Sequence, residues 1–248
     1  MARRGFSILE LLVSIAVIAV LLGITLPALF GARRSALELA AMAHQREVGA
    51  LVRQHGFDRE DTFPYFGVPG TDRAVLCLAP DDPRAGQPAP DGFPPCGETD
   101  YWDQPWRWAI HLRFLGYDTA FVGRPPELER ANGGRPVLLG TIDFLTFGAF
   151  ATPSYFTPGD PQDVSDHRAQ RWASVAFPSD KIVLQRPNVL RKRDDPGTDE
   201  TFSWFADGHV EMIALSEMGP AVTIRNYLFT PRPGLSTLGG LSGRDRSP

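Results

Sequence analysis

The sequence predicts an α+β protein in which one long N-terminal helix packs against an antiparallel β-sheet, with long loops between the elements. Three observations predict this class. Residues 11–32 carry no charge, helical spacing of apolar side chains continues to position 55, and short β-rich runs follow in the C-terminal half. The 24 glycines and 23 prolines indicate long irregular connections.

Composition excludes several classes of protein. The 248 residues are 43% hydrophobic and 22% charged, with a formal net charge of -4, which is typical of a folded chain. No run of five or more Lys or Arg residues occurs, so no nucleic-acid partner is predicted. The roughly 200 residues after the apolar N-terminus suffice for one domain with a sizeable core.

The uncharged stretch 11–32 is long enough to span a membrane. As a helix it would measure about 33 Å, and a bilayer core is about 30 Å thick. Arg3 and Arg4 precede it, which favours a cytoplasmic N-terminus and export of the rest; Arg33 and Arg34 weaken this asymmetry without reversing it. We therefore expect a single-pass membrane protein with a cytoplasmic N-terminus and its domain on the opposite side of the membrane.

Three ordinary kinds of N-terminal segment fit less well. A secretory signal should end in a small-x-small cleavage site, which Ala28 to Ala36 does not offer. A lipoprotein signal needs a cysteine directly after the apolar run, and the first cysteine is Cys77. A plain membrane anchor leaves Glu10 unexplained, because a carboxylate at the mouth of a membrane helix is costly and usually functional.

The string Arg3-Arg4-Gly5-Phe6-Ser7-Ile8-Leu9-Glu10-Leu11-Leu12 resembles the processing motif of type IV prepilins and type II secretion pseudopilins. The resemblance implies that a prepilin peptidase cuts between Gly5 and Phe6 and methylates the new Phe6 amine. Glu10 then becomes the fifth residue of the mature chain. The resemblance also implies a pilin-like fold and, as partners, other pilin or pseudopilin subunits that pack through the N-terminal helix. It places the protein in the bacterial inner membrane, with its N-terminus cytoplasmic before processing and its domain in the periplasm or in an extracellular filament.

Physical chemistry agrees with a role of Glu10 in assembly. A core of packed apolar helices has a low dielectric constant, so an unpaired carboxylate there costs several kcal/mol. The ammonium group of Phe6 on a neighbouring subunit is a suitable counter-charge. Pro27 lies within the same helix and is either a kink or a tolerated transmembrane proline.

The chain is expected to comprise a leader (1–5), a transmembrane and amphipathic helix (6–56), an α+β domain (57–233) and a flexible tail (234–248) rich in Gly, Ser and charge. Gly56 is the expected C-cap of the helix. One stripe of the helix carries Leu37, Ala41, His44, Val48, Leu51 and His55. His44 and His55 are interpreted as hydrogen-bonded helix residues rather than ligands.

Within the domain, a short helix is expected from Gln104 to Gly116, with Pro105 at its first turn. The tryptophans Trp102, Trp106 and Trp108 favour core packing over sugar stacking. Strands are expected at Ala74–Ala79, Val137–Phe147, Trp172–Phe177, Lys181–Gln185, Phe202–Ala206 and His209–Leu215. Asp207 and Gly208 between the last two predict a two-residue type I′ hairpin turn.

The segment Phe205-Ala206-Asp207-Gly208-His209-Val210-Glu211, late in a prepilin-like chain, resembles the H-X9-DG pseudopilin-like family. Phe144 to Phe156 and Ser179 to Gln185 are weakly similar to segments of that family. The histidine of its motif should stand ten positions before Asp207, where this sequence has Gly197. No histidine role is therefore carried over.

Cys77 and Cys96 are the only cysteines. In an exported domain such a pair favours a disulfide, the alternative being two unpaired thiols in a loop. Two weak metal arrangements are conceivable. Asp166-His167 could meet Asp207 and His209, or Asp194, Asp195 and Asp199 could form a calcium loop. Solvated turn carboxylates are the preferred interpretation, so no metal, cofactor or catalytic residue is predicted.

Two functions remain. The first is a structural subunit, a minor pilin or pseudopilin of a type IV pilus or type II secretion-type filament. The second is a membrane-tethered periplasmic binding or metal-dependent domain that uses a prepilin-type anchor. Glu10 favours the first, because a mere anchor does not need it.

Overall fold

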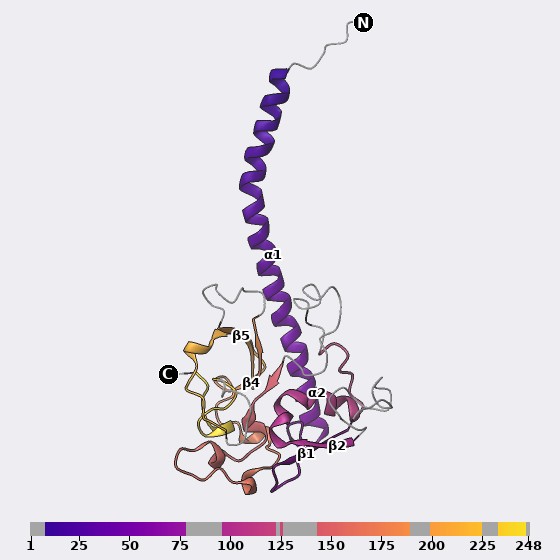
Figure 1. Cartoon of the computed structure of the whole chain (residues 1–248), viewed down its shortest axis with the longest axis vertical. Coiled ribbons are helices and arrows are strands. Elements are labelled where there is room, and N and C mark those ends of the chain that lie inside the picture. Colours follow the sequence, from indigo (N-terminus) through magenta and orange to yellow (C-terminus); the bar gives the residue numbers. More distant parts are fainter. Residues whose placement is uncertain are drawn as a thin grey trace. The chain divides into compact units, whose positions relative to one another are not determined.

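The structure is a computed structural model that describes residues 8–77, 96–122, 125, 143–188, 199–224 and 233–246. The chain divides into two compact units, residues 1–40 and residues 41–248. One long helix, α1 (Ile8–Asp58), contributes to both, and antiparallel strands and a second helix follow it (Figure 1). The predicted α+β class with a long N-terminal helix is confirmed.

Helix α1 changes character along its length. Every residue from Ile8 to Ala36 is exposed, whereas from Ala41 onward one face is buried. The buried face comprises Ala41, His44, Gln45, Val48, Gly49, Leu51, Val52, His55 and Gly56. The predicted stripe is therefore confirmed from Ala41 to His55. The helix includes Pro27 and continues past it.

The expected end of the helix at Gly56 is wrong, because α1 continues to Asp58. Gly56 instead allows a close approach: a Cβ added there would lie 2.4 Å from Nε1 of Trp172. A Cβ on Gly49, two turns earlier on the same face, would lie 2.3 Å from the Trp204 ring. These two glycines let tryptophans rest directly on the helix backbone.

A two-stranded sheet follows α1. Strand β1 (Arg73–Cys77) pairs antiparallel with β2 (Cys96–Asp100), and the register places Cys77 opposite Cys96. These two cysteines form a disulfide, as predicted. Helix α2 (Gln104–Phe114) follows with Pro105 in its first turn, as expected from its start signal.

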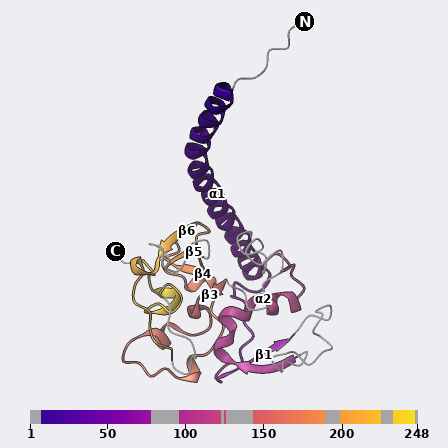
Figure 2. The ribbon, with the colours of Figure 1, turned by 45° about the horizontal axis from the view of Figure 1, so that its top comes forward.

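The second sheet is an antiparallel meander in the order β3-β4-β5-β6, with the four strands side by side in Figure 2. Its strands are β3 (Phe144–Leu145), β4 (Ile182–Pro187), β5 (Glu200–Phe205) and β6 (Val210–Ala214). The main core unites this sheet with the buried face of α1, since Leu145, Val183, Leu184 and Trp204 share one cluster with Val48, Leu51 and Val52.

Two expected strands differ from the structure. Only Phe144–Leu145 of the expected strand 137–147 is extended among the described residues, and 137–142 lie outside them. The expected strand at Trp172–Phe177 is wrong, because Trp172–Ser174 is a 3-10 helix. Its backbone turns locally, with N–H of Val175 donating to the Trp172 carbonyl, while the Trp172 ring stacks on Phe63 at 4.2 Å.

The expected loose tail also differs from the structure over its described part, residues 234–246. Leu235, Ser236 and Leu241 are buried there, and Asp245 is fully buried. The carboxylate of Asp245 lies 3.2 Å from Nζ of Lys181 and accepts a 2.6 Å hydrogen bond from the Ile182 N–H. A composition rich in Gly, Ser and charge predicts a loose tail, but the buried carboxylate of Asp245 fixes this segment to the start of β4.

Candidate functional site

The N-terminal half of α1 presents one carboxylate on an otherwise apolar surface. Glu10 stands in the first turn of the helix, while Gly5 and Phe6 lie outside the described residues. The hydroxyls of Ser14 and Thr25 donate to carbonyls four residues earlier, at 2.7 and 2.9 Å. Both polar side chains are therefore satisfied by the helix itself, as a low-dielectric environment requires.

The surface around Glu10 is apolar over several turns. Its exposed large side chains include Ile8, Leu9, Leu11, Leu12, Val13, Ile15, Val17, Ile18, Val20, Leu21, Leu22, Ile24, Leu26, Leu29 and Phe30. Helix α1 is thus long and apolar enough to cross a membrane. A soluble protein does not normally leave so continuous an apolar surface uncovered.

A buried arginine ties α1 to the sheet. Nη2 of Arg186, on β4, donates to the carbonyl of Ala41 at 2.7 Å, and Nη1 lies 2.9 Å from Nδ1 of His44. Since arginine only donates, Nδ1 of His44 accepts, and its Nε2–H donates to the Phe121 carbonyl at 2.9 Å. Asp143, fully buried like Arg186, lies 3.8 Å from its Nε.

His44 and His55 behave as helix residues with backbone partners, which agrees with the interpretation from sequence. Nδ1 of His55 lies 3.2 Å from the Thr62 carbonyl. Burial lowers the pKa of His55, and this effect outweighs the hydrogen bond that raises it. The neutral form is therefore favoured in the folded domain.

Sequence reasoning did not single out Arg186, Lys181 or Asp245, although all three are fully buried. Burial lowers the pKa of Lys181 and raises the pKa of Asp245 to about 6, because both charges have lost their water. For Lys181 and Arg186, the available signal is their position next to the β-rich run 182–185. It is weak, because such residues usually face solvent.

The segment Asp207-Gly208-His209 forms a hairpin between β5 and β6, but the predicted two-residue type I′ turn is wrong. The loop has three residues, 206–208. The backbone N–H of Gly208 donates to the carbonyl of Phe205, and the backbone N–H of Phe205 donates to the carbonyl of His209. Gly208 has φ of 98°, and Asp207 is not among the residues with positive φ. This is a type I turn followed by a glycine bulge, the usual three-residue hairpin.

Side chains support this turn. Oδ1 of Asp207 accepts from the His209 backbone N–H at 3.1 Å and from its Nδ1 at 2.6 Å. The imidazole stacks on the buried ring of Phe205, with centroids 4.1 Å apart. His209 is therefore only partly exposed.

The described residues of the two conceivable metal sites make other contacts in the structure. Asp166 accepts hydrogen bonds from Thr152 and Ser154, and Nδ1 of His167 lies 2.6 Å from the Thr71 carbonyl. Within the described part of the chain, no three His, Cys, Asp or Glu side chains group so as to hold a metal ion. Asp194 and Asp195 lie outside it.

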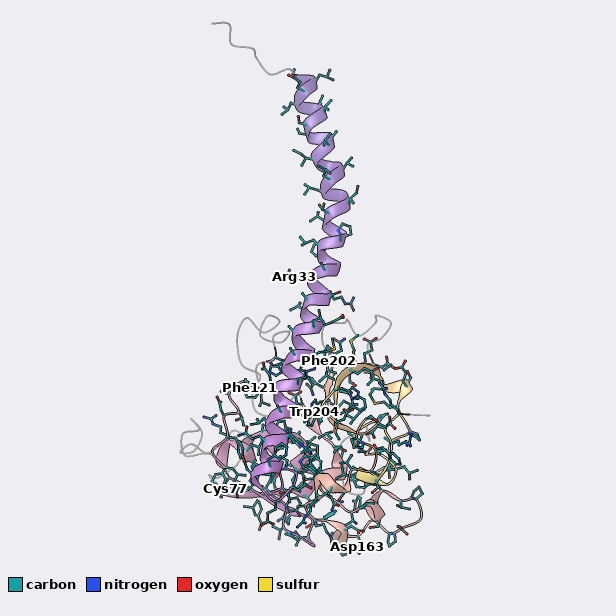
Figure 3. The ribbon with its side chains drawn as sticks, turned by 180° about the vertical axis from the view of Figure 1, so that it is seen from behind. Arg33, Cys77, Phe121, Asp163, Phe202 and Trp204 are labelled. Carbon is teal, nitrogen blue, oxygen red and sulfur yellow. A yellow bond between two sulfur atoms is a disulfide. The ribbon has the colours of Figure 1, made fainter. Side chains whose placement is uncertain are left out.

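The expected tryptophan cluster divides between core and surface. Trp102 and Trp108 are buried, and Nε1 of Trp108 donates to the Asp143 carbonyl at 2.9 Å. Trp106 is partly exposed and carries the Arg107 guanidinium 4.3 Å from its ring centroid. Figure 3 shows the side chains of this unit and of α1 together.

Comparison with known proteins bears on the N-terminus. Residues 1–26 match the family described as the prokaryotic N-terminal methylation motif. No curated protein and no solved structure matches the chain. The match covers the leader string, Glu10 and most of the apolar half of α1. This motif, on the long exposed apolar helix that carries it, supports a type IV prepilin-like or pseudopilin-like protein.

Proposed function

We propose that the chain is a minor pilin or pseudopilin, a structural subunit of a type IV pilus or type II secretion-type filament. In this proposal a prepilin peptidase cleaves between Gly5 and Phe6 and methylates Phe6. The mature subunit then packs with others through α1, while its domain stands in the periplasm or on a surface filament. The observation that carries the proposal is the methylation motif on a helix whose apolar N-terminal half carries Glu10.

Processing is tested first. The protein is purified from its native membrane, and its intact mass and N-terminal sequence are determined. The expected product begins at a methylated Phe6. A mature chain that still begins at Met1, or that begins after residue 28, contradicts the proposal.

Assembly is tested with Glu10→Ala, which should leave cleavage intact and impair incorporation into filaments. Ser14→Ala is the matched control, because Ser14 lies one turn away and its hydroxyl bonds only to the helix backbone. Immunogold labelling of sheared surface filaments gives the readout, and also distinguishes a pilus from a periplasmic pseudopilus. Normal assembly of the Glu10 variant would favour the alternative, a tethered domain that uses α1 only as an anchor.

We further propose, from the resemblance of the hairpin segment, that the chain belongs to the H-X9-DG family. Its motif match lies outside residues 1–26, so no comparison tests it. The hairpin around Gly208 accounts structurally for the aspartate-glycine pair, without any chemistry.

A further inference from the structure

Strand β6 forms one edge of the larger sheet. It is the last strand of the meander β3-β4-β5-β6, so β5 is its neighbour on one side only (Figure 2). Two hydrogen bonds fix which backbone groups of this hairpin face β5. The N–H of Phe205 donates to the His209 carbonyl, and the N–H of Leu215 donates to the Asp199 carbonyl. Because bonded pairs alternate along an antiparallel ladder, the pairs 203–211 and 201–213 belong to the same series.

The backbone of the even-numbered residues therefore points away from β5. Among the residues that the structure describes, neither the N–H nor the carbonyl of Val210 or Met212 has a hydrogen-bond partner. Ala214 differs, because its N–H lies 3.4 Å from Oε2 of Glu217. The open part of the edge thus consists of Val210 and Met212, and each of them can exchange two hydrogen bonds with an added strand.

Strand β6 lacks the usual features that protect a sheet edge. Proline, lysine or a β-bulge normally blocks pairing with another chain. The segment Val210–Ala214 contains neither proline nor lysine, and its pairing with β5 is regular. Its one charged residue, Glu211, pairs with Arg246, and the Glu211 side chain remains 44% exposed. An edge of this kind is a template for an extended chain, which binds through its backbone.

The side chains on the two faces of β6 determine which extended chain fits. Val210 belongs to the core cluster shared with α1, and Met212, on the same face, is half-buried. The other face carries Glu211, with Asp207 before the strand and Glu217 after it. Residues directly opposite each other on two strands share a face, and like charges there are destabilising. The matching segment therefore alternates apolar residues, opposite Val210 and Met212, with lysine or arginine, opposite Glu211.

A second copy of β6 does not fit this edge. Two antiparallel β6 strands would be related by a two-fold axis perpendicular to the sheet, which reverses every direction within the sheet plane. Since residues 41–58 of α1 pack on this sheet, they would run in opposite directions in the two copies, which one shared membrane does not allow. The other described edge strands fit no better, because β3 has only two residues and β2 carries Glu98 and Asp100. The occupant is therefore a segment of a different protein.

We propose that the outer edge of β6 binds an extended segment of a partner protein as an additional antiparallel strand. Apolar residues of that segment lie opposite Val210 and Met212, and a basic residue lies opposite Glu211. This docking surface belongs to the domain. It goes beyond assembly through α1 and does not depend on it.

Amide exchange, measured by NMR on the full-length protein in detergent micelles, tests the edge itself. The amides of Val210 and Met212 should exchange at least about tenfold faster than those of Glu211 and Ile213, because only the latter two bond to β5. Equal protection of all four amides in the protein alone would show that the edge is already covered, and would overturn the proposal.

Binding is tested by isothermal titration calorimetry with a short acetylated peptide in which valine alternates with lysine. We expect it to bind and to slow the exchange of the Val210 and Met212 amides. The same peptide with N-methyl groups on its valines should bind at least about tenfold more weakly, because the valine N–H groups face β6. N-methyl groups on the lysines face away and should leave binding unchanged. A peptide with glutamate in place of lysine should also bind more weakly.

Variants of β6 complete the test. Met212→Pro removes an outward N–H while the ladder to β5 keeps its bonds, and proline is tolerated at such an edge position. It should weaken peptide binding at least about tenfold, whereas the matched control Met212→Leu keeps the N–H and should bind like the parent protein. Glu211→Lys should reverse the preference, so that the glutamate peptide binds more tightly than the lysine peptide. Melting curves confirm that each variant is folded.

Three results would overturn the proposal. The first is equal binding of the parent peptide and the peptide methylated on its valines. The second is an unchanged preference for lysine in the Glu211→Lys variant, which remains decisive if Met212→Pro does not fold. The third is a dimer of the full-length protein, formed without peptide, whose contact protects the Val210 and Met212 amides, because it would assign the edge to a second copy.

Discussion

At the scale of single residues, the domain contains charged side chains that are fully buried and pair with each other. Lys181 and Asp245 are both fully buried and 64 positions apart, with Nζ and Oδ1 separated by 3.2 Å. Asp245 also accepts hydrogen bonds from the Ile182 N–H and the Thr237 hydroxyl. Such a pair adds little to the free energy of folding compared with an apolar pair. Removing one partner, however, leaves the other charge buried and unpaired.

We therefore expect Asp245→Ala to lower the free energy of unfolding by about 3–5 kcal/mol, because it leaves the ammonium of Lys181 buried and unpaired. The matched control is Asp180→Ala, which breaks the more exposed pair with Arg244 at 3.2 Å and should cost at most about 1 kcal/mol. Urea unfolding measures both. The double variant Lys181→Met with Asp245→Leu should lose less than the sum of its single changes. Additive losses would contradict a coupled pair.

A second residue-scale prediction concerns acid stability. Burial, with smaller contributions from His55 and Arg59, lowers the pKa of His111 to about 4. In the unfolded chain this histidine binds its proton near pH 6.5. Between these two values only the unfolded chain is protonated, so stability is present above pH 6.5 and is lost as pH falls toward 4. The loss is at most about 3 kcal/mol.

The variant His111→Gln should lose this contribution, so its unfolding free energy should depend less on pH between 6.5 and 4 than that of the parent protein. His209→Gln is the control, since His209 is partly exposed. Equal pH slopes for the parent and the His111 variant would show that His111 does not titrate differently on folding.

At the scale of elements, the close contact between α1 and the sheet depends on glycine. The Trp204 ring occupies the place where a Cβ of Gly49 would stand, at 2.3 Å. Trp172 does the same at Gly56, and the two indoles meet edge to face with centroids 5.9 Å apart. The helix and β5 can therefore approach only where side chains are missing.

Gly49→Ala should lower the melting temperature, although alanine is the better helix former by about 1 kcal/mol. Overpacking against a buried indole typically costs about 1–3 kcal/mol, so the net effect is a loss. Gly31→Ala lies on the same helix with no atom within 4 Å of its Cβ and should not destabilise the domain. A Gly49 variant as stable as the parent would mean that Trp204 moves aside freely.

At the scale of the whole molecule, the two units differ in what stabilises them. Among the residues that the structure describes, the fully buried members of the three apolar clusters all follow position 47. The part of α1 from Ile8 to Ala36 is exposed throughout and needs a membrane or neighbouring helices to cover it. The structural ties of α1 to the sheet begin at Ala41.

We therefore expect residues 36–248, exported behind a cleavable signal so that Cys77 and Cys96 can oxidise, to be soluble and to unfold cooperatively. Far-UV circular dichroism and a melting curve measure this. The disulfide should contribute roughly 3 kcal/mol by restricting the unfolded chain, so a reductant should lower the melting temperature. A fragment that aggregates or melts without a transition would show that the N-terminal half of α1 is part of the fold.

Local signals account for what the sequence alone determined. Composition and spacing within a few turns were enough for the apolar helix with Glu10, its buried stripe from Ala41 to His55, helix α2 and the position of the hairpin at Gly208. The prokaryotic methylation motif is likewise continuous in sequence. In each case the deciding interactions are between near neighbours, or between one segment and its solvent.

The tertiary structure alone decided what depends on distant partners. Arg186 finds the Ala41 carbonyl across 145 positions, and Asp245 fixes a segment whose composition indicated a loose tail. From local sequence, Gly56 has the pattern of a helix cap. Its contact with the Trp172 ring cannot be predicted locally, because Trp172 lies far along the chain. The hairpin loop has three residues rather than two, because the register of β5 and β6 pairs Trp204 with Val210. Such contacts leave no periodic trace in sequence, because each joins segments that meet only when the core has formed.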